Sequence, residues 1–132
     1  MDYIGTTINQ SPTIVLKASA DLTAVQGIAF GVSSGKAALP SAGANAIGVA
    51  IISQDANIKS GEDIVLQIKD VGKMVASAAI AVGAEVSVTN AGKAKTAESG
   101  EFILGTALTA ATAAGDLISV QITKSGYKPA SA

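Results

Sequence analysis

The chain has 132 residues, which suits one domain or two small units that share one core. Its nine Lys nearly balance ten Asp and Glu, and Arg is absent, so the basic footprint of a nucleic-acid-binding protein is missing. Without His or Cys, the chain cannot form Ser-His or Cys-His nucleophile pairs, thiolate metal sites or disulfides. The composition therefore favours a binding or structural role over catalysis.

Residues 1–20 predict an extended N-terminal arm that is interrupted at Pro12. The arm shows no helical period, and it is too apolar for a purely solvating tail. Such a segment can add to a sheet edge on a partner, so we expect it to bind a shell or a neighbouring subunit. An alternative, that it adds an edge strand to its own domain, remains open. The candidate binding residues of the arm are Tyr3, Ile4, Ile8 and Ile14.

Beyond the arm, short apolar runs alternate with turn signals, which is typical of an all-β barrel or sandwich. The segment 106–116 has helical propensity, but we favour strand-turn-strand there because its counterpart, 50–63, is a poor helix. Residues 124–132 are expected to form a loose C-terminal tail. The candidate strands lie within residues 14–17, 28–32, 46–52, 64–69, 73–78, 86–89, 102–108 and 117–123.

A repeat divides the domain 21–123 into two similar β units, 25–68 and 82–122. Residues 35–51 match 92–108 without a gap, and 60–68 match 114–122. Gly48 and Gly105 lie inside two matching apolar runs, and each predicts a bulge or the close approach of another backbone. The identical pairs of the first match are Gly35/Gly92, Lys36/Lys93, Ala37/Ala94, Gly43/Gly100, Gly48/Gly105 and Ala50/Ala107.

Several motifs suggest chemistry weakly, and a turn explains each of them better. Glu62 and Asp63 are adjacent, so in a strand their carboxylates would point to opposite faces. The acidic loop 53–63 contains Lys59, which opposes a calcium site. The run GVSSGK at 31–36 is one residue short of a phosphate-binding loop and lacks its hydroxyl residue. We predict no catalytic, cofactor-binding or metal-binding residue.

The segment order carries a resemblance to a known family. Gly48-Val49-Ala50 is followed by a polar loop and a Gly-acidic-β unit at 61–68, and then by VGAEVSV at 82–88. LGTAL at 104–108 and AAGDLISVQI at 113–122 complete the order. This arrangement resembles the small capsid cement, or head decoration, proteins of tailed bacteriophages. Residues 83–86 lack the aromatics that this family often carries, and 1–20 match no fixed pattern, so no shell-binding residue is carried over.

The resemblance implies a structural virion protein that binds the outer surface of an assembled head and stabilises contacts between major capsid subunits. It also implies a homotrimer with the major capsid protein as partner, and a small β-barrel or sandwich of β-tulip type built from two duplicated units. An alternative is a head-fibre or tail-associated trimerisation or carbohydrate-binding module.

We expect no nucleic-acid or membrane partner and synthesis in the host cytoplasm. The N-terminus lacks the features of a signal peptide, and the apolar stretch 74–86 is too short to span a bilayer.

Overall fold

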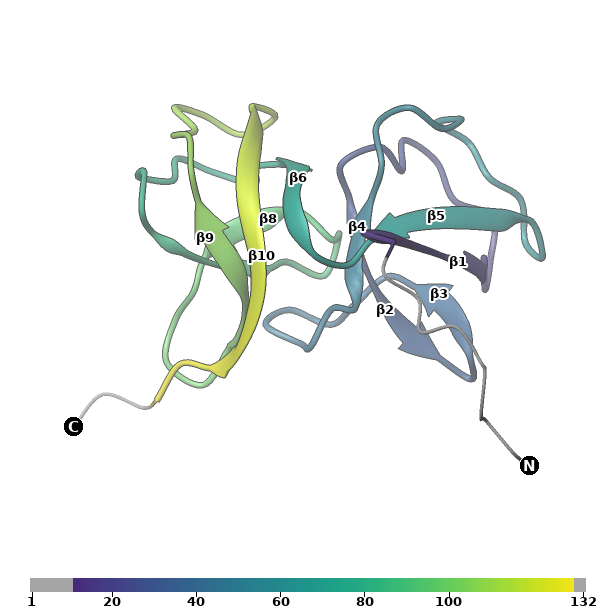
Figure 1. The fold of residues 1–132 in the computed structure, drawn as a ribbon, viewed down its shortest axis with the longest axis horizontal. Helices are drawn as coiled ribbons and strands as arrows, with labels where there is room; N and C mark the ends of the chain where they lie inside the picture. Colours follow the sequence, from purple (N-terminus) through teal and green to yellow (C-terminus); the bar gives the residue numbers. More distant parts are fainter. Residues whose placement is uncertain (1–10, 130–132) are drawn as a thin grey trace.

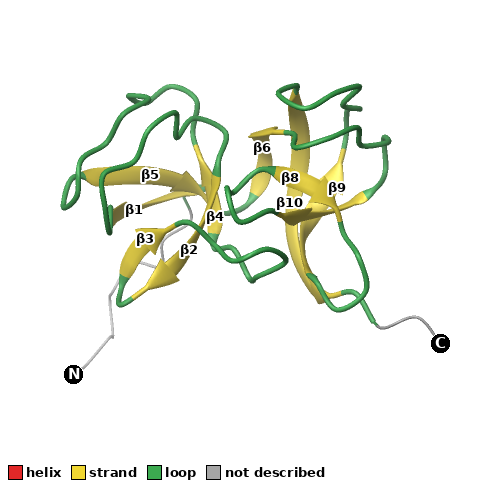
Figure 2. Cartoon of the chain, turned by 180° about the vertical axis from the view of Figure 1, so that it is seen from behind, coloured by secondary structure: helices red, strands yellow, loops and turns green. Residues whose placement is uncertain are grey.

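The computed structural model describes residues 11–129 of the chain. Within this range the protein contains ten β-strands and no helix. The strands form two antiparallel sheets of five strands each, which lie side by side in both views of the molecule (Figures 1 and 2). The prediction of an all-β fold built from two units is therefore confirmed, and segment 106–116 is not helical.

The first unit is a five-stranded sheet with the order β1-β5-β4-β2-β3. β1 pairs antiparallel with β5, and Thr13 lies opposite Gln67. A parallel bridge between Ala18 and Ala37 joins the region after β1 to β3 at the other edge, so the sheet curls toward a closed barrel. The strands are β1 (Thr13–Lys17), β2 (Ala29–Ser33), β3 (Lys36–Ala38), β4 (Gly48–Ala50) and β5 (Asp63–Gln67).

The second unit repeats this arrangement with the order β6-β10-β9-β7-β8. Each strand of the first unit thus has a counterpart, β1 with β6 and β5 with β10. A parallel bridge between Ala76 and Ala94 again joins the two edges of the sheet. The strands are β6 (Asp70–Val75), β7 (Glu85–Val88), β8 (Ala94–Thr96), β9 (Phe102–Ala107) and β10 (Leu117–Tyr127).

The interior contains two hydrophobic cores, one mainly in each unit, and Ala29, Ala46 and Val49 of the first unit belong to the second core. The first is centred on Phe30, Ile64 and Leu66, and the second on small and medium side chains such as Met74 and Ile118. Phe30 is the only fully buried aromatic residue between positions 11 and 129, so alanine, valine, isoleucine and leucine fill most of the interior. Burial alternates along β10, as expected for a strand with one face on the core.

Gly48 and Gly105 occupy matching positions in β4 and β9, where a neighbouring backbone comes close. A Cβ atom at Gly48 would lie 2.5 Å from the carbonyl oxygen of Gln67. At Gly105 the same atom would lie 1.9 Å from the carbonyl oxygen of Gln121, the counterpart of Gln67. Only glycine avoids these contacts, and neither position has the positive φ that would by itself require glycine.

The boundaries differ from the sequence-based expectation at both ends. The arm was expected to reach residue 20, but the first sheet begins at Thr13 because Ile14 and Leu16 pack on its own core. The tail was expected from residue 124, but β10 passes an irregularity and continues to Tyr127, which lies opposite Phe102. The expected units 25–68 and 82–122 also leave out β1 and β6, the first strand of each sheet.

Candidate interaction surface

The two units are joined by a loop of the first that docks on the second. The backbone N–H of Gly43, in the loop between β3 and β4, donates to the Val88 carbonyl at 2.8 Å. The Phe102 N–H donates to the Gly43 carbonyl at 3.0 Å. Gly43 has a φ of +71°, and a Cβ there would lie 2.7 Å from Cγ of Glu101. The positive φ favours glycine here, whereas the Glu101 side chain could move away from an added Cβ.

Two further contacts hold the units together. The Ala29 N–H donates to the Gly92 carbonyl at 2.7 Å, and a Cβ at Gly92 would lie only 2.3 Å from the Ala29 carbonyl oxygen. The Lys124 ammonium of the second unit donates to Oδ1 of Asn45 and to the carbonyl of Ala46 in the first. Burial lowers the pKa of Lys124, because the charged form loses hydration there. The pair of units is thus connected by specific contacts as well as by the chain.

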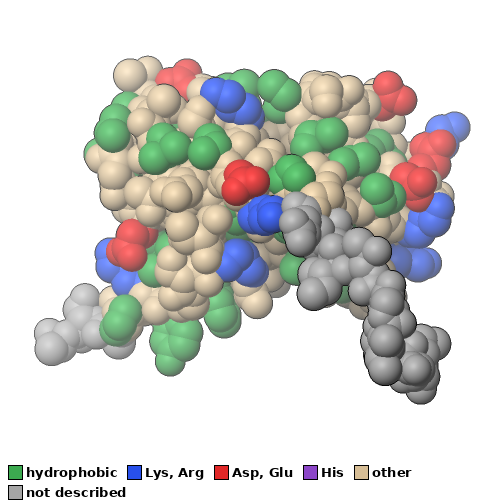
Figure 3. Space-filling model, in the orientation of Figure 1, with side chains coloured by type: hydrophobic (Ala, Val, Ile, Leu, Met, Phe, Trp, Pro, Cys, Tyr) green, Lys and Arg blue, Asp and Glu red, His purple; other side chains and the backbone are tan. Residues whose placement is uncertain are grey.

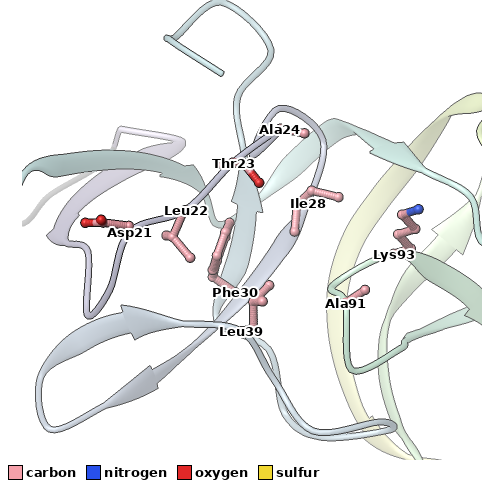
Figure 4. Close-up of a pocket in the computed structure, with 9 residues that line it drawn as sticks. All are labelled: Asp21, Leu22, Thr23, Ala24, Ile28, Phe30, Leu39, Ala91 and Lys93. Atoms are coloured by element: carbon pink, nitrogen blue, oxygen red, sulfur yellow. The ribbon is translucent and has the colours of Figure 1, made fainter. Parts of the chain in front are cut away.

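A cavity of about 290 Å³ lies where the units meet, and Figure 4 shows the side chains around it. Its apolar side is formed by Leu22, Ile28, Phe30 and Leu39, with Lys93 on the second unit and Asp21 on the first. Oδ1 of Asp21 accepts the Ser60 N–H at 2.9 Å, which ties this carboxylate to a turn. The cavity can take an apolar group, but it offers no nucleophile with an adjacent base.

An exposed aromatic pair lies on the second unit, beside the docked Gly43 loop. The rings of Phe102 and Tyr127 meet edge to face, with centroids 5.7 Å apart. Tyr127 is 60% exposed and Phe102 38%, so the pair presents apolar area to solvent. In the view of Figure 3, hydrophobic side chains are spread over both units, and positive and negative charges lie among them. The surface is thus suited to macromolecular contact without a strong field of either sign.

The charges near the aromatic pair are themselves paired. The ammonium of Lys95 lies 2.9 Å from Glu101, and that of Lys128 lies 3.8 Å from Glu85. The hydrogen bond to Glu101 raises the pKa of Lys95. Burial acts to raise the pKa of Glu101, but the bonds from Lys95 and the Glu98 N–H outweigh it, so this pKa is lowered. Both groups stay charged at neutral pH and neutralise each other.

The residues predicted for the arm do not form a described site. Ile14 lies in β1 and packs against the core of the first unit, as the edge-strand alternative expects. Tyr3, Ile4 and Ile8 lie outside the described residues.

The acidic residues that suggested chemistry hold turns or exposed pairs instead. Oε1 of Glu62 accepts the Lys59 N–H at 2.8 Å, and Asp63 pairs with Lys17 at 2.5 Å. Between positions 11 and 129, no three His, Cys, Asp or Glu residues gather in a way that could hold a metal ion. No helix in that range is long and apolar enough to cross a membrane.

The fold defines a class of small all-β protein made of two similar five-stranded units. The sequence matches the phage cement protein family over residues 7–122, so the chain belongs to this family, as the resemblance predicted. A search of curated proteins found no significant match. Among solved structures, the head fibre gp8.5 N base of bacteriophage phi29 is similar in fold, with a TM-score of 0.64. The identity is 16%, and the match covers 88% of this chain and 97% of that one.

Proposed function

We propose that the protein is a structural component of a phage head that binds the outer surface of the assembled shell and stabilises contacts between major capsid subunits. The observation that carries the proposal is membership of the phage cement protein family over nearly the whole chain. The surface supports it, because hydrophobic side chains and paired charges suit contact with protein.

The protein acts as a homotrimer in this proposal. Its described interior contains a single fully buried aromatic residue, so an isolated subunit gains from further burial. Between positions 11 and 129, ten large hydrophobic side chains remain exposed, among them Val15, Val32, Val82 and Leu117. A stable interface requires roughly 1,000 Å² or more of total buried surface, and these side chains provide apolar area for it.

A binding experiment tests the proposal. Purified protein is mixed with heads of the same phage assembled without it, and the heads are then sedimented. We expect saturable binding and a higher temperature of head disruption once the protein is bound. Heads that sediment without the protein, or that gain no stability from it, would contradict the proposal.

A second candidate is the base of a head fibre, in which the protein would attach a longer structure to the shell. The similarity to the phi29 head fibre base favours it, although at 16% identity this similarity establishes only the fold. In this case the protein would bind heads without raising their disruption temperature. The same sedimentation experiment therefore separates the two candidates.

A further inference from the structure

The site on which the Gly43 loop docks has a counterpart in the first unit, and none of residues 11–129 docks there. In the second unit, Val88 accepts the Gly43 N–H and Phe102 donates to the Gly43 carbonyl. The registers identify the equivalent backbone groups. Val88 lies opposite Ala94 in the β7–β8 hairpin, and Val32 lies opposite Ala37 in the β2–β3 hairpin. Ala37 and Ala94 are equivalent in the repeat, as are Asn45 and Phe102, so Val32 and Asn45 supply the matching carbonyl and N–H.

These two groups lack the partners that their counterparts have. In the part of the chain that the structure describes, the Asn45 N–H donates no hydrogen bond. No hydrogen bond from outside the β2–β3 hairpin reaches the Val32 carbonyl within that part either. A hollow of about 320 Å³ lies over them, lined in part by Gly31, Leu39 and Ala44. The counterpart of Gly31 is Ser87, which is fully buried in the second unit.

The second unit shows what kind of segment fits such a hollow. There it is a loop with a left-handed glycine that donates one backbone N–H and accepts one backbone N–H. The lining of the hollow contains no charged side chain, and the Lys124 ammonium beside Asn45 is already bound to Oδ1 of Asn45 and to the Ala46 carbonyl. A charged segment would therefore lose hydration without gaining a partner in the lining. The occupant is therefore expected to be an uncharged loop that contains a glycine.

The equivalent loop of a second copy is not available for this purpose. In the second unit, Gly100 is the counterpart of Gly43, but its N–H donates to the Lys128 carbonyl of the same chain at 2.8 Å. The Lys128 N–H in turn donates to the Glu101 carbonyl at 2.8 Å. The segment directly after β10 thus occupies the loop that could otherwise dock on a neighbour.

We propose that the hollow over Val32 and Asn45 is a docking site for an uncharged, glycine-containing loop of the shell protein. The loop donates to the Val32 carbonyl and accepts from the Asn45 N–H, in the manner of the Gly43 loop on the second unit. The proposal rests on the proposed function, since it names the part of the surface that holds the shell.

The test is the variant Gly31→Val, which fills the hollow. Gly31 lacks a positive φ, and a Cβ there would lie 3.9 Å from the nearest atom, the Ala38 carbonyl oxygen, so the strand accepts a side chain. Ala114→Val is the matched control, because it adds valine to an exposed turn of the second unit. Leu39→Lys is an independent variant that places a charge on the wall of the hollow. Thermal unfolding of all three checks that they fold.

Binding to heads made without the protein is then measured by sedimentation. We expect Gly31→Val and Leu39→Lys to bind roughly tenfold or more weakly than the wild type, and Ala114→Val to bind like it. If the wild type binds and both hollow variants bind equally well, the inference is wrong while the proposed function stands. If the wild type does not bind, both are wrong. Loss of self-association in the hollow variants, with head binding unchanged, would show that a second copy occupies the hollow.

Discussion

The two strand glycines allow a quantitative test of how the units are built. Gly105→Ala would place a methyl carbon 1.9 Å from the Gln121 carbonyl oxygen, and Gly48→Ala would place one 2.5 Å from that of Gln67. Both obstacles are backbone atoms of a paired strand, so they cannot rotate away as a side chain would. Gly31→Ala is the control, because its nearest atom lies at 3.9 Å.

Overpacking of a well-packed interior usually costs about 1–3 kcal/mol of unfolding free energy. The contact at Gly105 is the shorter, and relieving it must separate β9 from β10, so we expect a loss of about 3 kcal/mol there. At Gly48 we expect about 2 kcal/mol, within the same range. The control should be neutral or gain about 0.4–1 kcal/mol, because alanine restricts the unfolded chain.

Urea denaturation followed by far-ultraviolet circular dichroism measures all three variants. A loss of 3 kcal/mol corresponds to a fall of roughly 10 °C in melting temperature for a domain near this size, which provides a second measurement. The expected order of stability is Gly31→Ala, then Gly48→Ala, then Gly105→Ala. If Gly105→Ala were as stable as the control, the argument from close backbone approach would be wrong.

Three further predictions concern other contacts. The carboxylate of Asp116 accepts hydrogen bonds from the N–H and the hydroxyl of Thr112, and these bonds lower its pKa. The wild type therefore has stability above pH 4 that it loses as the pH falls through the lowered pKa. We expect Asp116→Ala to lack this stability. Urea titrations at several pH values would show the two proteins converging in acid. Lys124→Ala should lower the free energy of unfolding by about 1.5–3 kcal/mol, because a hydrogen bond from a charged group joins Lys124 to Asn45. A double-mutant cycle with Asn45→Ala should show that the two side chains are coupled. Deleting residues 1–10 should leave the melting temperature nearly unchanged but reduce head binding, and unchanged head binding would exclude the arm as a shell contact.

Local pattern made much of the fold predictable. The apolar runs and the turn glycines indicated a β-rich fold, and the matches between 35–51 and 92–108 indicated two similar units. The two sheets indeed share one strand order. The glycines within the runs marked places where backbone atoms come close, because no other residue fits there.

Contacts between distant residues were not predictable in this way. The sequence repeat includes Gly43 and Gly100 as identical residues, yet Gly43 docks on the other unit and Gly100 is bound by Lys128 of its own unit. Nothing local distinguishes these outcomes, since they depend on which segments meet in space. The bond from Lys124 to Asn45 joins residues 79 positions apart for the same reason. The end of β10 likewise depends on a non-local partner, since Tyr127 lies opposite Phe102.

Electron cryo-microscopy of native heads tests the central claim most directly. The account predicts density for this protein on the outer surface of the shell, as three copies around a three-fold or quasi-three-fold axis, in contact with at least two neighbouring major capsid subunits. Each copy should present the hollow over Val32 and Asn45 to a loop of the shell. Heads that lack this density, or copies that each contact a single capsid subunit, would contradict the proposed role in stabilising the shell.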